Sequence, residues 1–236
     1  MRINNYISAS GYCSRREADA LVLAKKVKIN GRLADVGSQV TEKDRVEVEG
    51  KRIVPVKKHV YIALNKPVGI TCTTERHVRG NIIDFIGHKE RIFPIGRLDK
   101  DSEGLILLTS DGSIVNEILR EENQHDKLYQ VTVNKKITPD FLGKMASGVT
   151  IFNPVKEKHE MTKPCTINSS GEYSFTIVLS QGLNRQIRRM CEALGYTVVS
   201  LKRTRIMHIK LGKLKTGEWR ELSSAEIGGL TKARKK

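Results

Sequence analysis

Two helical patterns open the chain. Apolar residues recur at helical spacing from Ile3 to Ile7, and again over residues 18–22. Ser14 precedes the second pattern and Glu17 stands three residues after it, which is the arrangement of a capping box. The pattern therefore predicts two short helices, the second of which begins directly after Ser14.

A strand pattern follows these helices. Apolar and polar residues alternate on both sides of Asn30-Gly31, a dipeptide that favours the tight turn of a β-hairpin, and another short alternating strand covers residues 44–50. We predict that residues 1–50 form a small domain of their own. Residues 51–59 combine a proline with a cluster of charge, which indicates a linker.

Strand patterns dominate the rest of the chain. The continuous apolar run from Leu105 to Leu108 is typical of a strand buried on both faces. A helical pattern begins at Asn184 and ends at Gly195, a good N-cap and C′ pair. Many strands with few helices between them predict an α+β fold with a mixed, largely antiparallel sheet over residues 60–230, followed by a basic tail at 231–236.

Composition adds a partner class. The 236 residues contain 42 Lys and Arg against 26 Asp and Glu, a formal net charge of +16. Such an excess is typical of proteins that bind polyanions, although a basic protein without a specific partner remains an alternative. No stretch has the length of a membrane span and the N-terminus has no apolar signal segment, so we expect a cytoplasmic protein without a membrane partner. The four cysteines lie far apart without a CxxC pair, so no metal site is expected.

The first candidate for chemistry is Asp99, in the stretch "GRLDKDSEGLILLTSDG". It lies at the mouth of the predicted buried strand, between Arg97 and Lys100. Taken alone, it could be a solvated turn residue, or a carboxylate that the strand holds at a cleft. The remaining motifs decide between these two interpretations.

The first fifty residues resemble the S4 (αL-like) RNA-binding domain through "INNYISASGYCSRREADALV", "KVKINGRLA" and "DRVEVEG". The resemblance implies RNA contacts by Arg2, Arg15 and Arg16. Many members carry a basic residue where this chain has Asn5. A phosphate contact at that position is therefore not implied.

The remainder resembles the RsuA-type family of ribosomal RNA pseudouridine synthases. The motifs "LNKPVGI", "FPIGRLDKDSEGLILLTSDG", "KLYQVTV", "GLNRQIRRM" and "GEWREL" occur in the family's order. The pattern is most similar to the large-subunit pseudouridine synthase F subgroup; Leu183, where many relatives have Arg, agrees with that subgroup. The resemblance implies conversion of a uridine in RNA to pseudouridine without a metal, nucleotide or redox cofactor, by a protein that we expect to be a monomer.

The resemblance also implies a set of site residues. Asp99 matches the family's catalytic aspartate, Tyr129 its active-site tyrosine and Arg188 its basic partner; we expect Arg188 to pair with Asp99 and keep it ionised. By itself, Tyr129 would be a core or sheet-surface residue. Arg97, two residues before Asp99, is placed to enter the gap left by the base, and a simple surface arginine stays open as the alternative. The predicted RNA-contact set is completed by Lys66, Asn184, Arg185, Gln186, Arg189, Arg203 and Arg205, with Lys66 also shaping the floor of the cleft.

The expected substrate is ribosomal RNA, with 23S RNA favoured by the subgroup. Two alternatives stay open: the same chemistry on 16S ribosomal RNA or a tRNA, and a non-catalytic RNA-binding or ribosome-assembly protein. Target choice cannot be derived from the residues, because RNA specificity lies in shape and in splayed bases.

Overall fold

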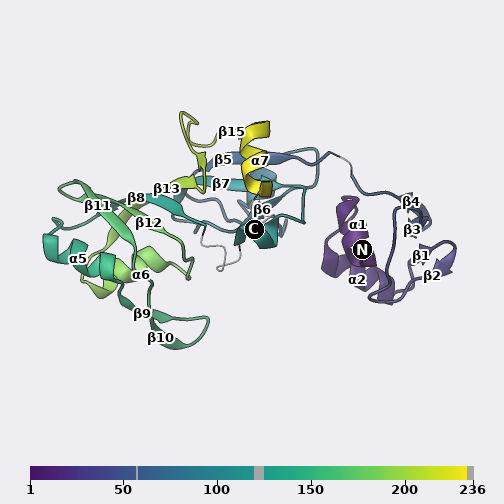
Figure 1. Ribbon diagram of the computed structural model, residues 1–236, viewed down its shortest axis with the longest axis horizontal. Coiled ribbons are helices and arrows are strands. Elements are labelled where there is room, and N and C mark those ends of the chain that lie inside the picture. Colours follow the sequence, from purple (N-terminus) through teal and green to yellow (C-terminus); the bar gives the residue numbers. More distant parts are fainter. Residues whose placement is uncertain (57, 120–124, 233–236) are drawn as a thin grey trace. The chain divides into compact units, whose positions relative to one another are not determined.

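The computed structural model describes residues 1–56, 58–119 and 125–232 (Figure 1). The chain divides into two compact units, each with its own internal packing. The N-terminal unit comprises Met1–Val60 with His88–Ile92 and Thr109–Ser113. The large unit comprises Tyr61–Gly87, Phe93–Leu108 and the described residues from Ile114 onward.

In the N-terminal unit, two helices pack on a small antiparallel sheet. The helices are α1 (Ile3–Ala9) and α2 (Arg15–Leu23), and the sheet has the order β2-β1-β3-β4, with β1 Val27–Ile29, β2 Arg32–Leu33, β3 Val46–Val48 and β4 Lys51–Ile53. Ser14 and Glu17 form the predicted capping box at the start of α2. Asn30 and Gly31 have φ angles of 52° and 81°, the left-handed pair of a tight hairpin turn. The predicted helices and hairpin are confirmed.

Residues 51–53 differ from the expected linker. They form β4, which pairs with β3 across a turn at Glu49-Gly50, where φ is 50° and 79°. Such a turn joins two strands tightly, so the alternation of β3 continues through it into the charged segment. The sequence does not predict this strand, because Lys51 and Arg52 are charged and lie exposed at the edge of the sheet, where no apolar pattern is needed.

The large unit is built on a mixed sheet. Along the sheet the order is β11-β12-β8-β13-β7-β5-β15, with β6 paired to β7 and β14 paired to β13. The parallel pair is β7 with β13, and the remaining registered pairs are antiparallel. This is the predicted α+β class with a largely antiparallel sheet. The strands are β5 Tyr61–Lys66, β6 Phe93–Ile95, β7 Glu103–Thr109, β8 Lys127–Val133, β11 Thr166–Gly171, β12 Ser174–Leu179, β13 Val198–Ile206, β14 Ile209–Lys210 and β15 Trp219–Glu221.

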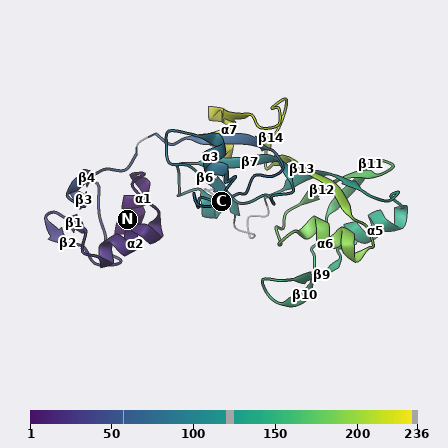
Figure 2. The ribbon, with the colours of Figure 1, turned by 180° about the vertical axis from the view of Figure 1, so that it is seen from behind.

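Helices cover the sheet of the large unit. Figures 1 and 2 show α5 (Pro139–Ser147) and α6 (Gln186–Ala193) against the part formed by β8, β11 and β12. Phe141 and Met190 from these helices pack against Val131 and Phe175 of the strands. The other elements are α3 Ile82–Ile86, α4 Val115–Leu119, α7 Ser224–Lys232 and a separate hairpin of β9 Thr150–Asn153 with β10 Lys158–Met161.

The centre of the sheet places two strand backbones unusually close together. Residues Leu105–Leu108 of β7 are buried, as the apolar run predicts. At Gly104, with φ of 105°, a side-chain carbon would lie 2.3 Å from the carbonyl oxygen of Arg203 on β13. Only glycine allows this approach, so β7 leaves the preceding loop at a defined position. Residues 233–236 of the predicted basic tail lie outside the described residues, whereas α7 extends to Lys232.

Candidate active site

The loop between β6 and β7 holds Asp99 at a fixed place. The backbone N–H of Gly69 donates to the carbonyl of Lys100 at 2.7 Å, and the N–H of Leu98 donates to the Sγ of Cys72 at 3.4 Å. Within the loop, the N–H of Ser102 donates to the carbonyl of Asp99 at 3.1 Å. The segment that follows β5 therefore holds the residues on both sides of Asp99, and the bond from Ser102 closes the loop itself. Its side chain is 32% exposed, which fits a carboxylate at a cleft rather than a solvated turn residue.

Asp99 faces a cavity of about 530 Å³. Arg97, Tyr129 and Arg203 also line the cavity, together with the segment 179–187 that leads from β12 into α6. Tyr129 lies on β8, opposite Ile177 of β12 and Arg203 of β13. The structure thus brings together Asp99 and Tyr129, which are separated by thirty residues in sequence, and adds Arg97 from the same loop.

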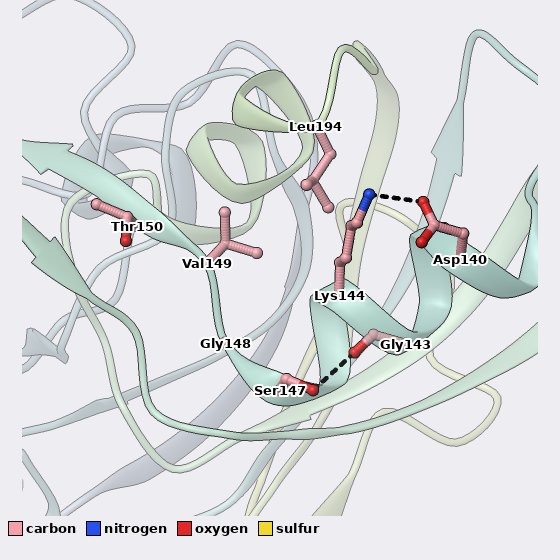
Figure 3. Close-up of a pocket in the computed structure, with 8 residues that line it drawn as sticks. All are labelled: Asp140, Gly143, Lys144, Ser147, Gly148, Val149, Thr150 and Leu194. Carbon is pink, nitrogen blue, oxygen red and sulfur yellow. Dashed lines mark hydrogen bonds and ion pairs between the residues drawn. The ribbon is translucent and has the colours of Figure 1, made fainter.

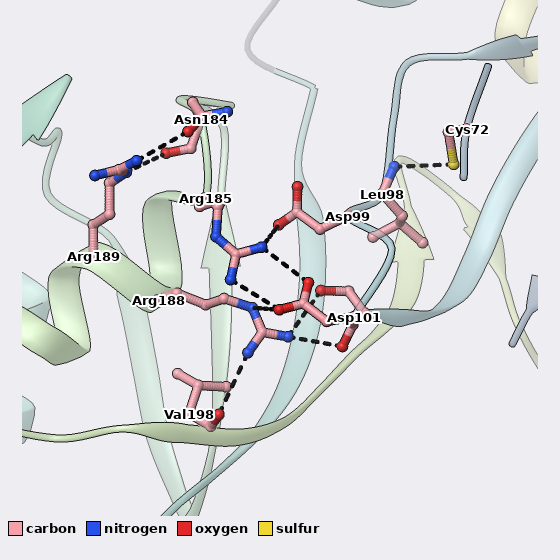
Figure 4. Close-up of polar contacts among 10 residues, drawn as sticks. Cys72, Leu98, Asp99, Asp101, Asn184, Arg185, Arg188, Arg189 and Val198 are labelled. Carbon is pink, nitrogen blue, oxygen red and sulfur yellow. Dashed lines mark hydrogen bonds and ion pairs between the residues drawn. The ribbon is translucent and has the colours of Figure 1, made fainter. Parts of the chain in front are cut away.

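Arg185 links the start of α6 to this loop. Its guanidinium donates two hydrogen bonds to the carboxylate of Asp101, at 3.0 and 2.8 Å, and lies 3.7 Å from the carboxylate of Asp99 (Figure 4). The hydrogen bonds from Arg185 hold the pKa of Asp101 below its usual range, since they stabilise the charged form. Asp101 therefore accepts two short hydrogen bonds from Arg185, and the contact of Arg185 with Asp99 is the longer one.

Arg188 has a different partner from the one expected. Its Nη2 donates to the carbonyl of Asp101 at 2.9 Å and to Oγ of Ser102 at 3.1 Å, and its Nε lies 3.4 Å from the Asp101 carboxylate (Figure 4). A longer contact of 3.4 Å reaches the carbonyl of Val198 on β13. Arg185, not Arg188, makes the described ion pair with Asp99, because Arg185 lies at the tip of the helix, closer to the cavity. Arg188 instead fastens α6 to the end of the Asp99 loop.

The start of α6 also departs from the sequence expectation. The N-cap is Arg185 with φ of 49°, rather than Asn184, and no side chain caps through a hydrogen bond there. The side-chain carbonyl of Gln186 instead accepts from the N–H of Leu183 at 3.1 Å. This unusual backbone at Arg185 is sustained by its two bonds to Asp101.

The predicted RNA-contact residues fall into exposed and interior groups. Asn184, Arg185 and Arg189 lie on the surface at the start of α6, where Arg189 donates to Asn184 at 3.1 and 3.2 Å. Arg205 is half-buried and donates to the carbonyl of Met207 at 2.7 Å. Arg97 is exposed at the cavity, and the N-terminal unit exposes Arg2, Arg15 and Arg16.

Three residues expected to contact RNA lie inside the large unit instead. Lys66 is fully buried, and its Nζ donates to the carbonyls of Pro67 and Ile70, both at 2.9 Å. Arg203 is 4% exposed and donates through Nε to the carbonyl of Leu105 at 2.7 Å; Gln186 is equally buried. These side chains support the loop and the cavity from within, because no phosphate can reach a buried ammonium. Burial lowers the pKa of Lys66.

Sequence reasoning missed Asp101, which is the residue that binds both arginines. The signal was present as a second acid two positions after Asp99 in "RLDKDS". A sequence of charged residues in a loop gives no indication of which acid meets which base. The bonded groups of Asp101 and Arg188 are 87 positions apart.

A separate hollow, which shares no lining residue with the cavity at Asp99, shows which side chains distinguish that cavity. About 450 Å³ in volume, it lies beside α5 and is lined by eight residues that include Asp140 and Lys144 (Figure 3). These two charges pair with each other at 2.7 Å. The hollow therefore offers neither the several cations nor the aromatic ring that line the cavity at Asp99.

The described residues offer neither a metal-binding cluster nor a membrane-spanning helix. No group of three or more His, Cys, Asp or Glu side chains lies close enough together to hold a metal ion in the described ranges. None of the described helices combines the length and apolar character that a membrane crossing requires.

Comparisons with known proteins agree with this arrangement. Residues 60–193 match the RNA pseudouridylate synthase family, and residues 1–46 match the S4 domain. The chain is 52% identical to the dual-specificity RNA pseudouridine synthase RluF of Salmonella typhi, over 98% of this chain and 78% of the relative. It is 35% identical to the ribosomal large subunit pseudouridine synthase B of Bacillus subtilis (strain 168), over 96% of this chain and 93% of the relative.

A solved structure described as a pseudouridylate synthase superposes with a TM-score of 0.69 at 29% identity, covering 98% of this chain and 99% of its own. The family match includes the Asp99 loop, the strand of Tyr129 and the start of α6. An S4 domain joined to a sheet that assembles these elements around one cavity, in a chain so similar to known synthases, identifies the protein as a member of the RNA pseudouridylate synthase family, an enzyme that acts on RNA.

Proposed function

We propose that the enzyme converts a uridine of ribosomal RNA, in the 23S molecule of the large subunit, to pseudouridine, with Asp99 as the catalytic carboxylate. The observation that supports this best is the shared cavity of Asp99 and Tyr129. Its volume of about 530 Å³ accommodates one extruded nucleoside. Large-subunit specificity is supported by the name of the Bacillus subtilis relative.

The reaction is an isomerisation, so atoms must balance within the nucleotide. The bond between the ribose C1′ and N1 of uracil breaks, the base turns, and C1′ forms a bond to C5. The hydrogen at C5 is then lost and N1 gains one. An ionised Asp99 acts at the sugar or the base as a nucleophile or as an electrostatic partner. Any bond that its carboxylate forms to the nucleotide is broken again before the product leaves, so the free carboxylate is restored. The hydroxyl of Tyr129 assists the removal of the proton at C5.

The ring of Tyr129 has a second role in this scheme. A detached uracil must be held against diffusion while it turns. The flat ring of Tyr129 on β8 offers a stacking surface for it. Buried Ile187 and Leu201 line the same cavity and keep its floor dry.

Access to the target requires that the uridine leave its helix. Extruding a nucleotide costs a few kcal/mol, which contacts to the backbone and an inserted side chain offset. Arg97 is exposed and lies two residues before Asp99, so it can occupy the space that the base vacates. The exposed Asn184 and the half-buried Arg189 at the start of α6 are suited to the phosphates on either side.

The test is pseudouridine mapping of total RNA from cells with and without the protein, and from cells that carry Asp99→Asn. We expect one or more sites in 23S ribosomal RNA to disappear in both altered strains. Because relatives at 51–52% identity carry the name dual-specificity, the map must include tRNA. Loss of sites only in 16S RNA or tRNA would refute the 23S assignment, and an unchanged map with Asp99→Asn would refute the role of Asp99.

A further inference from the structure

A second hollow adjoins the cavity that Asp99 faces, and the Asp99 loop lines both of them. Its volume is about 530 Å³, and it is lined by the turn that follows β5, with Val68 and Thr71, and by the loop residues 97–101. Arg97, Leu98, Asp99 and Arg185 line both hollows. The two hollows are therefore neighbouring compartments that share one wall.

We propose that this second hollow is a subsite for the nucleotide next to the target uridine in the same RNA strand. The inference rests on the proposed function, because it takes the first cavity as the place of the target. A strand whose target base enters one compartment must run past Asp99, and the shared wall brings its neighbour to the other.

The side chains that line the hollow suit the base and the phosphate of a nucleotide. Val68 is 60% exposed, and it lines the hollow together with the largely buried Leu98, which offers an apolar surface on which a base can lie. Arg97 and Arg185 present guanidinium groups at the shared wall, and bases of single-stranded RNA stack on such planes as they do on aromatic rings. Lys100 is exposed at the rim and adds a cation for the phosphate.

The carboxylates in the wall do not oppose an RNA strand. Asp101 is paired through two hydrogen bonds with Arg185, so this pair is neutral as a unit. Asp99 lines both hollows, and the guanidinium of Arg185 lies 3.7 Å from its carboxylate. Around it, Arg97 and Lys100 leave an excess of positive charge at the surface.

A basic loop extends the subsite outward. Residues 73–79 leave the hollow at Thr71 and return to it, since the N–H of Thr71 donates to the carbonyl of Gly80 at 2.9 Å. This loop exposes Arg76 and Arg79. Both side chains can meet the backbone of the strand as it leaves the hollow, and they outnumber Glu75, the acid that the same loop exposes.

The decisive variant is Val68→Glu, which places an anion in the middle of the apolar wall. Its matched control is Val155→Glu, a valine that is 80% exposed on the β9–β10 hairpin and lines neither hollow. The probe is a 23S ribosomal RNA stem-loop that the wild-type protein binds, assayed for Kd and for the rate of pseudouridine formation. We expect Val68→Glu to raise Kd and KM about tenfold, the order of one lost stacked base, with kcat changed less than twofold, and Val155→Glu to match the wild type.

RNAs with an abasic residue test whether the loss of affinity in Val68→Glu arises from the base next to the target. An abasic residue on the 5′ or the 3′ side of the target should weaken wild-type binding about tenfold at one of the two positions. On that RNA, Val68→Glu should cause little further loss, because the base it repels is already absent. Equal behaviour of Val68→Glu and Val155→Glu, or a full additional loss on both abasic RNAs, would overturn the subsite.

Two arms keep the test independent of folding and of the proposed function. Should Val68→Glu fail to fold, Lys100→Ala replaces it, with Lys158→Ala on β10 as control; only Lys100→Ala should raise Kd. If the wild type binds the stem-loop without forming pseudouridine, the 23S assignment fails. The Kd comparison between the variant and its control still decides the subsite.

Discussion

Replacing Arg188 by methionine should loosen the Asp99 loop from α6. The variant keeps the apolar stem and removes the guanidinium, whose bonds of 2.9 and 3.1 Å reach the carbonyl of Asp101 and the hydroxyl of Ser102. Its contacts at 3.4 Å, to the Asp101 carboxylate and to Val198, are too long to count as strong. The arginine side chain is 13% exposed, so the bonds are largely shielded from water.

The magnitude follows from those two bonds. A hydrogen bond that involves a charged group contributes about 1.5 kcal/mol or more, so the loss of two should lower the free energy of unfolding by about 3 kcal/mol. Arg189→Met is the matched control on the same helix, because the bonds of Arg189 reach only Asn184 within its own segment. The control should cost about 0.5 kcal/mol or less.

Urea unfolding followed by tryptophan fluorescence measures these values. Trp219 is the single tryptophan of the chain and lies on β15 of the large unit, so its signal reports that unit even if the two units unfold separately. Double-mutant cycles then identify the partner of Arg188. We expect a coupling of about 1 kcal/mol with Ser102→Ala and a value near zero with Asp99→Asn. A larger coupling with Asp99 than with Ser102 would refute the assignment of Arg188 to the loop end.

Four further outcomes are expected. Asp99→Asn should abolish pseudouridine formation and leave Kd for RNA nearly unchanged, since the amide keeps the shape without the charge; a turnover above a few per cent of wild type would contradict its role. Lys66→Met should lower the free energy of unfolding by about 1–3 kcal/mol in urea, because the carbonyls of Pro67 and Ile70 lose their buried donor, and a neutral result would contradict the described burial. Reversing the neighbouring pair Arg15 and Arg16 to Glu should reduce the slope of log K against log salt by about one or two units, measured by RNA titration, while an unchanged slope would exclude phosphate contacts there. Since the folded pKa of Asp101 is lowered, its pairing stabilises the fold above the unfolded pKa of about 3.9 and is lost as the pH falls through the lower folded value; urea unfolding across this range should show that loss in the wild type and not in Asp101→Asn.

The features that could be predicted from the sequence are those with local causes. The capping box at Ser14 and the turn at Asn30-Gly31 depend on residues within four positions of each other. The buried strand at Leu105–Leu108 follows from a continuous apolar run. The strand at 51–53 was not predicted, because its charged side chains lie at an exposed edge of the sheet, where a strand needs no apolar pattern.

The pairing of the site residues could not be predicted in the same way. Motif resemblance indicated Asp99 and Tyr129, and the structure places both on one cavity. It did not indicate that Arg185 adopts a left-handed backbone or that Asp101 binds it, because the two residues are 84 positions apart. Choosing among several acids and bases depends on where the tertiary fold brings each side chain.

The two acids of the loop therefore have separate tasks. If Asp99 received the two short bonds of Arg185, its oxygens would be occupied by donors and would be poor nucleophiles. Asp101 receives those bonds instead, while the Arg185 charge remains 3.7 Å from Asp99. At this distance the guanidinium adds positive charge beside Asp99 without a short hydrogen bond to its oxygens. The neighbouring acid thus anchors the helix to the loop, and the Asp99 side chain stays 32% exposed at the cavity.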